Sequence, residues 1–181
     1  MIPSILKWLV LAMLGQVANI VGYLLNPIVV LFHKDEVLPK WLSWFGQPDN
    51  TLKGDYGWRT EHWQFRYDLP TWLRNYVGRV GWLYRNNMQG FDDALGFTVS
   101  PVFSYNSIGH ESVSNRPLVN GCVFRTLEQQ DKTYWQLYFV FAWSEKFCLR
   151  GNFGWKMWAW PNGSARCSLV CSLQPFMGYE K

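Results

Sequence analysis

The sequence predicts an α+β protein with an N-terminal hydrophobic helix, expected to be transmembrane, a basic amphipathic helix and a C-terminal antiparallel β-meander. Three observations carry this prediction. A long apolar segment near the start of the chain is typical of a helix in lipid. An Arg-rich segment then shows helical spacing of its apolar residues, and from Phe91 onward the spacing shifts toward the period of two that strands show.

The N-terminal helix is predicted from Trp8–Phe32, which holds 25 residues and no Lys, Arg, His, Asp or Glu. About 20 predominantly apolar residues suffice to cross a bilayer. Asn26–Pro27 should interrupt the helix, because proline has no amide hydrogen and disfavours helical backbone in the residue before it. We therefore expect a continuous helix over Ser4–Leu25, within an anchor segment that spans residues 1–32.

Two other interpretations of this segment stay open. Its three amide side chains, Gln16, Asn19 and Asn26, favour a buried helix in the core of a soluble protein. A cleaved signal peptide fits less well, because the apolar run continues well past Ala18. Against a soluble helix stands the absence of a charged face, since a surface-packed helix shows polar residues on one side.

Small and polar residues form one stripe along this helix, at alternating spacings of three and four: Ala12, Gly15, Asn19, Gly22 and Asn26. In lipid, small residues let two helix backbones approach closely, and amides hydrogen-bond across the contact. The stripe is therefore a candidate helix-packing site. It would serve self-association or a protein partner, or it would pack against later segments of the same chain.

Residues 33–58 are predicted to connect this anchor to the rest of the protein, because they are rich in turn residues. Within them, Trp41–Phe45 is short and aromatic and follows Lys40. Such a segment would lie flat in the headgroup region of a membrane, or it would cover the domain as a hydrophobic plug.

The remaining residues, 59–181, are expected to form the α+β domain, with an Arg-rich helical part over 59–96 and a β part over 97–181. Asp68 and Pro70 have the residue types that begin a helix. Apolar residues then follow at helical spacing, opposite the candidate binding residues for an anionic surface: Arg74, Arg79 and Arg85. A basic amphipathic helix near a membrane anchor predicts contact with anionic headgroups. The alternative is an ordinary helix with solvated arginines.

Strands are expected where β-branched and aromatic residues gather between turn signals. The predicted strands are Phe97–Ser100, Gly121–Thr126, Thr133–Trp143, Phe153–Trp160 and Ala165–Leu173. Gln130–Lys132 should turn the second into the third, and Trp160–Ser164 contains the Asn-Gly pair of a hairpin turn. Tyr134–Trp143 is nearly all apolar, which predicts a central strand covered on both faces.

The cysteines and the net charge bear on location. Cys122, Cys148, Cys167 and Cys171 show neither a CxxC pair nor a zinc-binding spacing. On one strand, positions 167 and 171 lie too far apart for a mutual disulfide. Reduced thiols favour a cytoplasm-facing domain, and a formal charge of +4 is too small to predict nucleic-acid binding.

Two motifs, together with the apolar anchor, carry a family resemblance. Phe91–Phe97 reads FDDALGF and Arg150–Lys156 reads RGNFGWK. With these features the chain resembles, over nearly its whole length, a family of small uncharacterised proteins encoded by tailed bacteriophages and prophages. The resemblance implies a phage origin and a bacterial host, and it implies no activity or catalytic residue.

No pattern in the sequence predicts catalysis. Nucleotide-binding loops, nucleophile elbows and metal-spaced histidines are absent from it. His62 and His110 each adjoin a carboxylate, yet neighbours on a strand point to opposite faces. Asp92 and Asp93 would bind a divalent cation only with a third carboxylate. We therefore predict no catalytic residues, no metal site and no cofactor.

Taken together, these features predict a membrane-anchored bacteriophage accessory protein at the host inner membrane. Its domain should face the cytoplasm and act by binding host or phage components, not by catalysis. The expected partners are membrane lipid and either a protein or a second copy of the chain, held through the N-terminal helix. A structural component of the virion or its assembly is the first alternative, and an enzyme acting on lipid or cell wall is the second.

Overall fold

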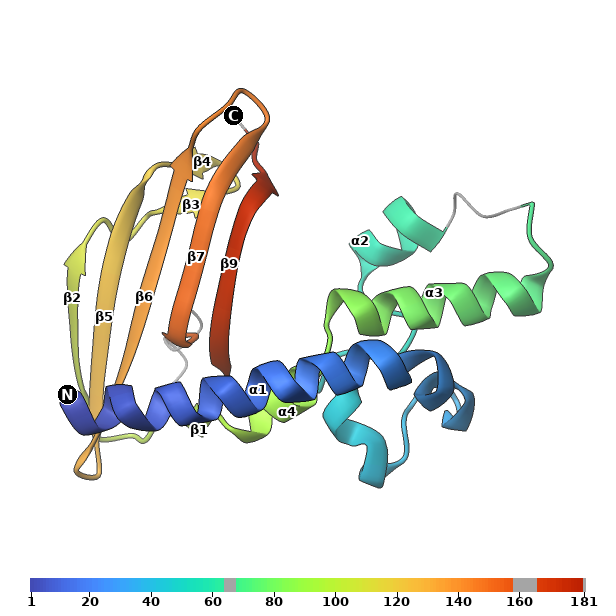
Figure 1. Ribbon diagram of the computed structural model, residues 1–181, viewed down its shortest axis with the longest axis horizontal. Coiled ribbons are helices and arrows are strands. Elements are labelled where there is room, and N and C mark those ends of the chain that lie inside the picture. The colour runs from blue at the N-terminus through green and yellow to red at the C-terminus, as the bar shows by residue number, and fades with distance from the viewer. Residues whose placement is uncertain (64–67, 158–165, 181) are drawn as a thin grey trace. The chain divides into compact units, whose positions relative to one another are not determined.

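A computed structural model describes residues 1–63, 68–157 and 166–180 and confirms the α+β class (Figure 1). The chain forms two compact units. The sheet unit comprises Met1–Met13 and Leu95–Lys181, and the helical unit comprises Leu14–Ala94. The N-terminal helix contributes residues to both units.

Helix α1 (Ile2–Val29) passes through Pro27 and ends in a 3₁₀ turn, η1 (Val30–Phe32). The predicted end at Leu25 is therefore wrong. Pro27 has no amide to donate to the carbonyl of Tyr23, one turn earlier. The hydroxyl of Tyr84 donates to that carbonyl instead, at 3.1 Å. Because a neighbouring side chain replaces the missing donor, the helix continues.

The described residues of the helical unit form five further helical segments: η2 (Lys40–Phe45), α2 (Tyr56–Trp58), the π-helical η3 (Arg59–Trp63), α3 (Thr71–Arg85) and α4 (Gln89–Ala94). Their core gathers six buried residues: Val29, Val30, Leu42, Leu52, Val80 and Leu83. Helix α3 is the predicted basic helix. It begins directly after Pro70, which is its N-cap and has no side-chain hydrogen bond, so the capping role expected near Asp68 is wrong.

The sheet unit is built on a five-stranded antiparallel sheet with the order β2-β5-β6-β7-β9 (Figure 1). The strands are β2 (Ser104–Gly109), β5 (Gly121–Gln129), β6 (Lys132–Ala142), β7 (Phe147–Trp155) and β9 (Leu169–Gly178). Two short pairs accompany it: β1 (Phe97–Thr98) with β8 (Arg166–Cys167), and β3 (Ser114–Asn115) with β4 (Leu118–Val119). Strand β6 is central, as predicted.

The strand predictions succeed where apolar residues alternate and fail where they do not. Gln130 and Asp131 form the predicted turn, both with positive φ. Strand β7 begins six residues before the predicted start at Phe153. Its middle is polar because the buried Asn152 accepts a hydrogen bond from the buried Gln136, at 2.9 Å. The predicted turn over Trp160–Ser164 lies outside the described residues.

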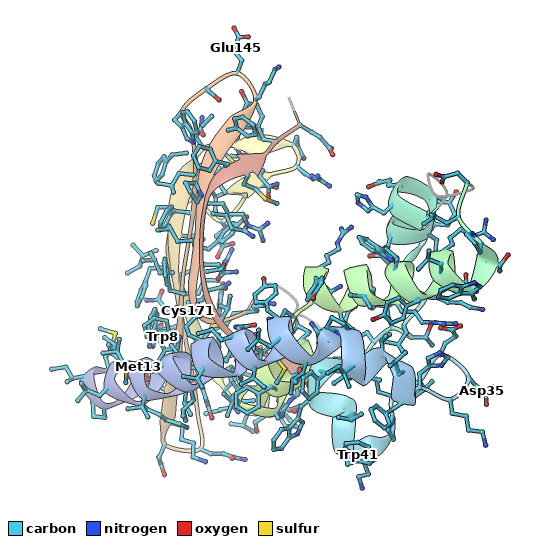
Figure 2. All side chains as sticks on the ribbon, turned by 45° about the vertical axis from the view of Figure 1, so that its right-hand side comes forward. Trp8, Met13, Asp35, Trp41, Glu145 and Cys171 are labelled. Carbon is cyan, nitrogen blue, oxygen red and sulfur yellow. The ribbon has the colours of Figure 1, made fainter. Side chains whose placement is uncertain are left out.

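The first turns of α1 belong to the core of the sheet unit. The hydroxyl of Ser4 donates to the carbonyl of Thr133 in β6. Trp8 is buried, its indole nitrogen donates to the carbonyl of Val170 at 3.1 Å, and its ring packs edge-on against Trp135. Figure 2 shows Trp8 close to Cys171, which packs against the same core. The N-terminal helix is thus an integral part of the fold.

Candidate membrane-binding surface

One side of α1 exposes apolar side chains along the whole helix. The exposed large apolar residues between positions 1 and 32 are Met1, Ile2, Ile5, Leu6, Leu9, Val10, Met13, Leu14, Val17, Ile20, Val21, Tyr23, Leu24, Leu25, Ile28, Leu31 and Phe32. We call this surface the outer face. Within α1, which the structure describes completely, Lys7 is the exposed charged residue and Gln16 the exposed amide.

The exposure of this face argues against a helix in a soluble core. The segment Ile2–Phe32 is long and apolar enough to span a membrane, and only 22% of its most apolar stretch is buried within the chain. A core helix would be mostly buried. Scattered apolar residues are ordinary on protein surfaces, whereas a continuous apolar patch marks contact with protein or membrane.

The opposite side of α1 holds the small and polar stripe. Ala12 lies in the core of the sheet unit, and Gly15 is buried. In the helical unit, the side-chain nitrogen of Asn87 donates to the backbone carbonyl of Asn19 at 2.7 Å and to its side-chain oxygen at 3.0 Å. The side chain of Asn26, which is fully buried, donates to the Oδ1 of Asn87 at 2.9 Å.

Close approach of a neighbouring segment explains Gly22, one of the two glycines in this stripe. A Cβ atom at Gly22 would lie 2.2 Å from the Oδ1 of Asn87 and 2.7 Å from the Cγ of Met88. Neither distance is compatible with van der Waals radii, so a larger residue would displace the segment after α3. Of the two uses proposed for the stripe, the structure shows packing against the chain's own segments, and it leaves the outer face for other contacts.

Aromatic rings follow the C-terminal end of α1 within the helical unit. In η2, Leu42 is buried while Trp41 and Trp44 are 69% and 56% exposed. Trp41 packs edge-on against Phe32, with ring centroids 5.7 Å apart. The segment therefore covers its own core with one side and presents indole rings with the other. Indole rings beside an apolar helix are typical of a protein that meets the membrane interface.

The three arginines proposed for an anionic surface have separate environments. Arg79 donates from Nε to the carboxylate of Glu36 at 2.7 Å, and this hydrogen bond lowers the pKa of Glu36. The guanidinium of Arg85 lies 5.8 Å from the centre of the Trp58 ring. Arg74 lines a pocket of about 380 Å³ with Lys53 and Arg59. The structure thus groups Arg74 with two residues that the sequence did not single out.

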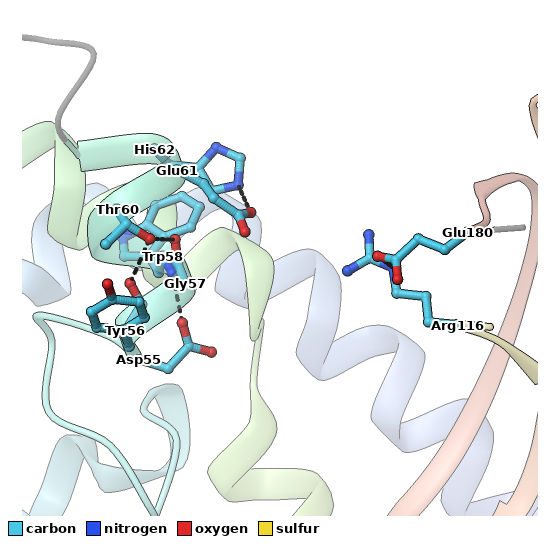
Figure 3. A network of polar contacts seen from close by, with 9 residues as sticks. All are labelled: Asp55, Tyr56, Gly57, Trp58, Thr60, Glu61, His62, Arg116 and Glu180. Atoms are coloured by element: carbon cyan, nitrogen blue, oxygen red, sulfur yellow. Dashed lines mark hydrogen bonds and ion pairs between the residues drawn. The ribbon is translucent and has the colours of Figure 1, made fainter.

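His62 and three carboxylates, those of Asp55, Glu61 and Glu180, make local contacts with neighbouring residues (Figure 3). Asp55 accepts a hydrogen bond from the backbone amide of Trp58 at 2.7 Å and caps α2. His62 lies 3.9 Å from Glu61 and packs against the Trp58 ring. Figure 3 also shows the exposed ion pair of the sheet unit, Arg116 with Glu180. Among the described residues, no three His, Cys, Asp or Glu side chains gather to hold a metal ion.

Two cysteines are poor nucleophiles for a physical reason. Burial raises the pKa of the Cys148 thiol, and it raises that of Cys167 to about 11. Both thiols are therefore protonated at neutral pH, and the thiolate is the reactive form. All four cysteines are free.

Sequence patterns did not identify the residues that hold α1 in the helical unit. Tyr84 lies in the last turn of α3, and Asn87 lies two residues after the end of this helix. Both contact α1 only because α3 packs beside it in the helical unit. The stripe on α1 could be recognised from the spacing of its residues. Its partner Asn87 could not, because a single Asn after a helix is also common at ordinary helix ends.

Comparison with known proteins gives a family but no activity. No curated protein and no solved structure matches the chain. The model of one family, described as a family of unknown function (DUF7338), matches residues 1–181. The match covers the whole chain, including both motifs that carried the resemblance to uncharacterised proteins. The protein is a member of the DUF7338 family of unknown function.

Proposed function

We propose that the protein is a membrane-anchored binding protein whose outer face of α1 lies in lipid. The single observation that carries this proposal is the continuous exposed apolar surface of α1, opposite a stripe that is already covered. Fully burying a large apolar side chain is worth about 1.5–3 kcal/mol. The exposed side chains of the outer face therefore supply enough free energy for stable attachment to a bilayer.

The contacts of α1 favour a helix that lies along the membrane surface. Ser4, Trp8 and Ala12 pack within the sheet unit, whose open sheet has edge strands that cannot be placed in hydrocarbon. The rest of the helix, from Leu14 to Val29, is about 24 Å long at 1.5 Å per residue, less than the roughly 30 Å of a hydrocarbon core. An in-plane helix keeps the outer face in lipid and requires no edge strand to enter hydrocarbon.

We extend the proposal to the location of the protein in the cell and to its origin. Free cysteines support a reducing compartment, so we place the protein on the cytoplasmic side of a bacterial inner membrane. The resemblance of FDDALGF and RGNFGWK supports a phage accessory protein that binds host or phage components there. The contacts of His62 with Glu61 and Trp58, and the raised pKa of the two buried thiols, favour binding over catalysis.

Fractionation of cells that express the full chain tests attachment. Pelleting with membranes that resists carbonate supports the proposal, and recovery in the carbonate supernatant contradicts it. Tags at the two termini test the orientation of α1. Proteolysis of both tags from the same side of the membrane supports an in-plane helix, whereas cleavage from opposite sides would show that the helix spans.

A structural component of the virion is the second candidate. One face of the sheet favours it, because Ile108, Phe141 and Leu173 are 66%, 46% and 59% exposed there. Apolar sheet faces of this kind are often buried between subunits. Co-purification of the chain with particles from an infected host, and its absence from the membrane pellet, would favour this candidate. An enzyme acting on lipid or cell wall would instead lose its effect on alanine substitution of Asp92, Asp93, His62 and His110.

A further inference from the structure

The helical unit contains a pocket of about 540 Å³, lined by parts of η2, of the segments on either side of it, of α4 and of α3. Helix α4 lies directly against η2 because residue 90 is a glycine. A Cβ atom at Gly90 would overlap the carbonyl oxygen of Ser43 and lie 2.9 Å from that of Gly46. Ligand pockets of proteins have volumes of about 300–1,000 Å³. The pocket is therefore large enough for a small organic molecule.

Trp82 brings an unpartnered hydrogen-bond donor to this pocket. The residue lines the pocket and is 2% exposed, and its indole nitrogen is buried without an acceptor among the described residues. Gly54 approaches the Cε3 and Cδ2 atoms of the ring, which lie on the side away from the nitrogen. A buried donor without an acceptor is costly for a folded protein. An oxygen of a bound molecule would supply the missing acceptor.

The turn after η2 supplies hydrogen-bond acceptors. Asp49 is exposed, and its carboxylate has no hydrogen bond or ion pair with any other described residue. The side-chain nitrogen of Asn50 donates to the Oε1 of Gln47 at 3.2 Å, which holds the turn and leaves the oxygen of Asn50 for a ligand. Asp93 adds a second carboxylate from α4. The lining thus combines one donor that needs an acceptor with several oxygen acceptors.

The charges at the pocket argue against an anion and against an ammonium ligand. No Lys or Arg is among the described residues that line it, and Arg79 and Lys53 already offset the charge of Glu36, which does line it. A phosphate or carboxylate ligand would therefore meet the two remaining carboxylates. An ammonium group would pair with those carboxylates but offers no acceptor to Trp82. A hydroxyl group satisfies both sides, because it accepts one hydrogen bond and donates another.

An exposed aromatic ring completes the lining. Trp44 in η2 is 56% exposed, and it packs edge-on against Phe91 with ring centroids 5.6 Å apart, which fixes its orientation. A flat ring of this kind packs against the C–H groups on one face of a sugar ring, while carboxylates and amides bind the hydroxyl groups. The donor, the acceptors and the flat ring together match a molecule that carries hydroxyl groups on an apolar ring.

We propose that this pocket binds a saccharide unit. An oxygen of the sugar accepts from the indole nitrogen of Trp82, and the sugar ring lies against Trp44. Hydroxyl groups of the sugar donate to Asp49 and Asp93. The proposal is independent of membrane attachment, because these four residues belong to the helical unit and none of them lies in α1. A free saccharide and the sugar headgroup of a glycolipid present the same chemistry.

Calorimetric titration of the full chain tests this site. The chain is kept in a polyoxyethylene detergent, because glucoside and maltoside detergents carry sugars of their own. The probes are glucose, N-acetylglucosamine and the β-1,4-linked disaccharide of each. The test variants are Asp49→Asn and Trp44→Ala, which change exposed residues and each remove one contact. We expect each variant to bind the preferred saccharide about 10- to 100-fold more weakly than the wild type.

Matched controls carry the same substitutions outside the pocket. Asp35→Asn and Trp72→Ala change exposed residues of the helical unit that do not line it, and they should keep wild-type affinity. A third test variant, Trp82→Phe, removes the indole N–H and should also weaken binding. Far-ultraviolet circular dichroism checks that all variants fold, and Asp49→Asn keeps the test valid if Trp82→Phe does not.

Equal losses in the test and control variants would overturn the proposal, as would a folded wild-type chain that binds none of these saccharides. Binding of choline or inorganic phosphate in place of the saccharides would also overturn it. Vesicles with and without monoglucosyl diacylglycerol distinguish the two sources of sugar. A preference for the glycolipid vesicles that Asp49→Asn removes supports a lipid headgroup, and saccharide binding without that preference supports a free saccharide.

Discussion

Charges placed on the outer face of α1 should release the protein from membranes. Val17, Ile20 and Leu24 follow one another along this face and are 60%, 62% and 71% exposed. Fully burying such a side chain is worth about 1.5–3 kcal/mol, so moving its exposed part into lipid contributes about 1–2 kcal/mol. The triple variant Val17→Glu, Ile20→Glu and Leu24→Glu therefore loses at least about 3–6 kcal/mol of attachment, before the cost of placing carboxylates in lipid.

At 1.4 kcal/mol per tenfold change, this loss lowers the partition coefficient for vesicles by about 10²- to 10⁴-fold. Glutamate is a good helix former, so the substitutions should leave the fold intact at these exposed positions. The assay is flotation of the full chain with phosphatidylcholine vesicles.

Two control variants separate the effect of charge on the outer face from the effects of charge elsewhere and of substitution itself. Val102→Glu with Tyr56→Glu places charges at residues that are 82% and 75% exposed and do not belong to α1, and should keep wild-type partitioning. Val17→Leu with Ile20→Leu keeps the outer face apolar and should do the same. If the triple variant floats as well as these controls while remaining folded, the outer face does not lie in lipid and the reasoning is refuted.

The internal contacts give four further predictions. Tyr84→Phe should lower the free energy of unfolding by about 1 kcal/mol in a denaturant titration, because a carbonyl of α1 loses the donor that replaces a proline amide. Asn87→Ala should cost more, about 2–3 kcal/mol, since it leaves the buried side chain of Asn26 and the half-buried Asn19 without this partner. An unchanged midpoint of the titration would show that water replaces Asn87. The Glu36–Arg79 ion pair lowers the pKa of Glu36 in the folded state, so it stabilises the protein above the ordinary pKa of 4.5, and this stability is lost as the pH falls below that value. In Glu36→Gln, the free energy of unfolding should therefore depend less on pH below 4.5, as acid-unfolding titrations would show. At pH 8 a thiol reagent should modify the exposed Cys122 and leave Cys167 unmodified until the protein unfolds, as peptide mass spectrometry would show.

Sequence patterns predicted the elements whose residues repeat regularly. For the apolar anchor, the basic helix and the central strand β6, the residue pattern within the segment itself was enough to predict its structure. Strand β2 was missed because it reads SYNSIG, without apolar alternation, and its pairing with β5 decides its structure. Pro27 misled the prediction because the compensating hydroxyl of Tyr84 lies 61 residues away from the carbonyl that it contacts.

The candidate sites show the same limit. The stripe on α1 was detectable from spacing, yet its contact with Asn87 depends on the fold. Arg74, Arg79 and Arg85 share one helix, and spacing alone suggested a shared role. The structure separates them because Glu36 and Trp58 come from other segments. A pocket assembled from residues 53, 59 and 74 has no local pattern and required the structure.

Photolabelling from within the bilayer shows directly whether the outer face of α1 lies in lipid. The full chain is bound to vesicles that contain a phospholipid with a photoreactive group on its acyl chain, and the labelled residues are mapped by mass spectrometry. If the outer face lies in lipid, we expect labels on Val17, Ile20, Leu24 and their neighbours on this face, and none on Ala12 or Gly22. Labelling on all sides of α1, or none within it, would show that the outer face does not bind lipid as proposed.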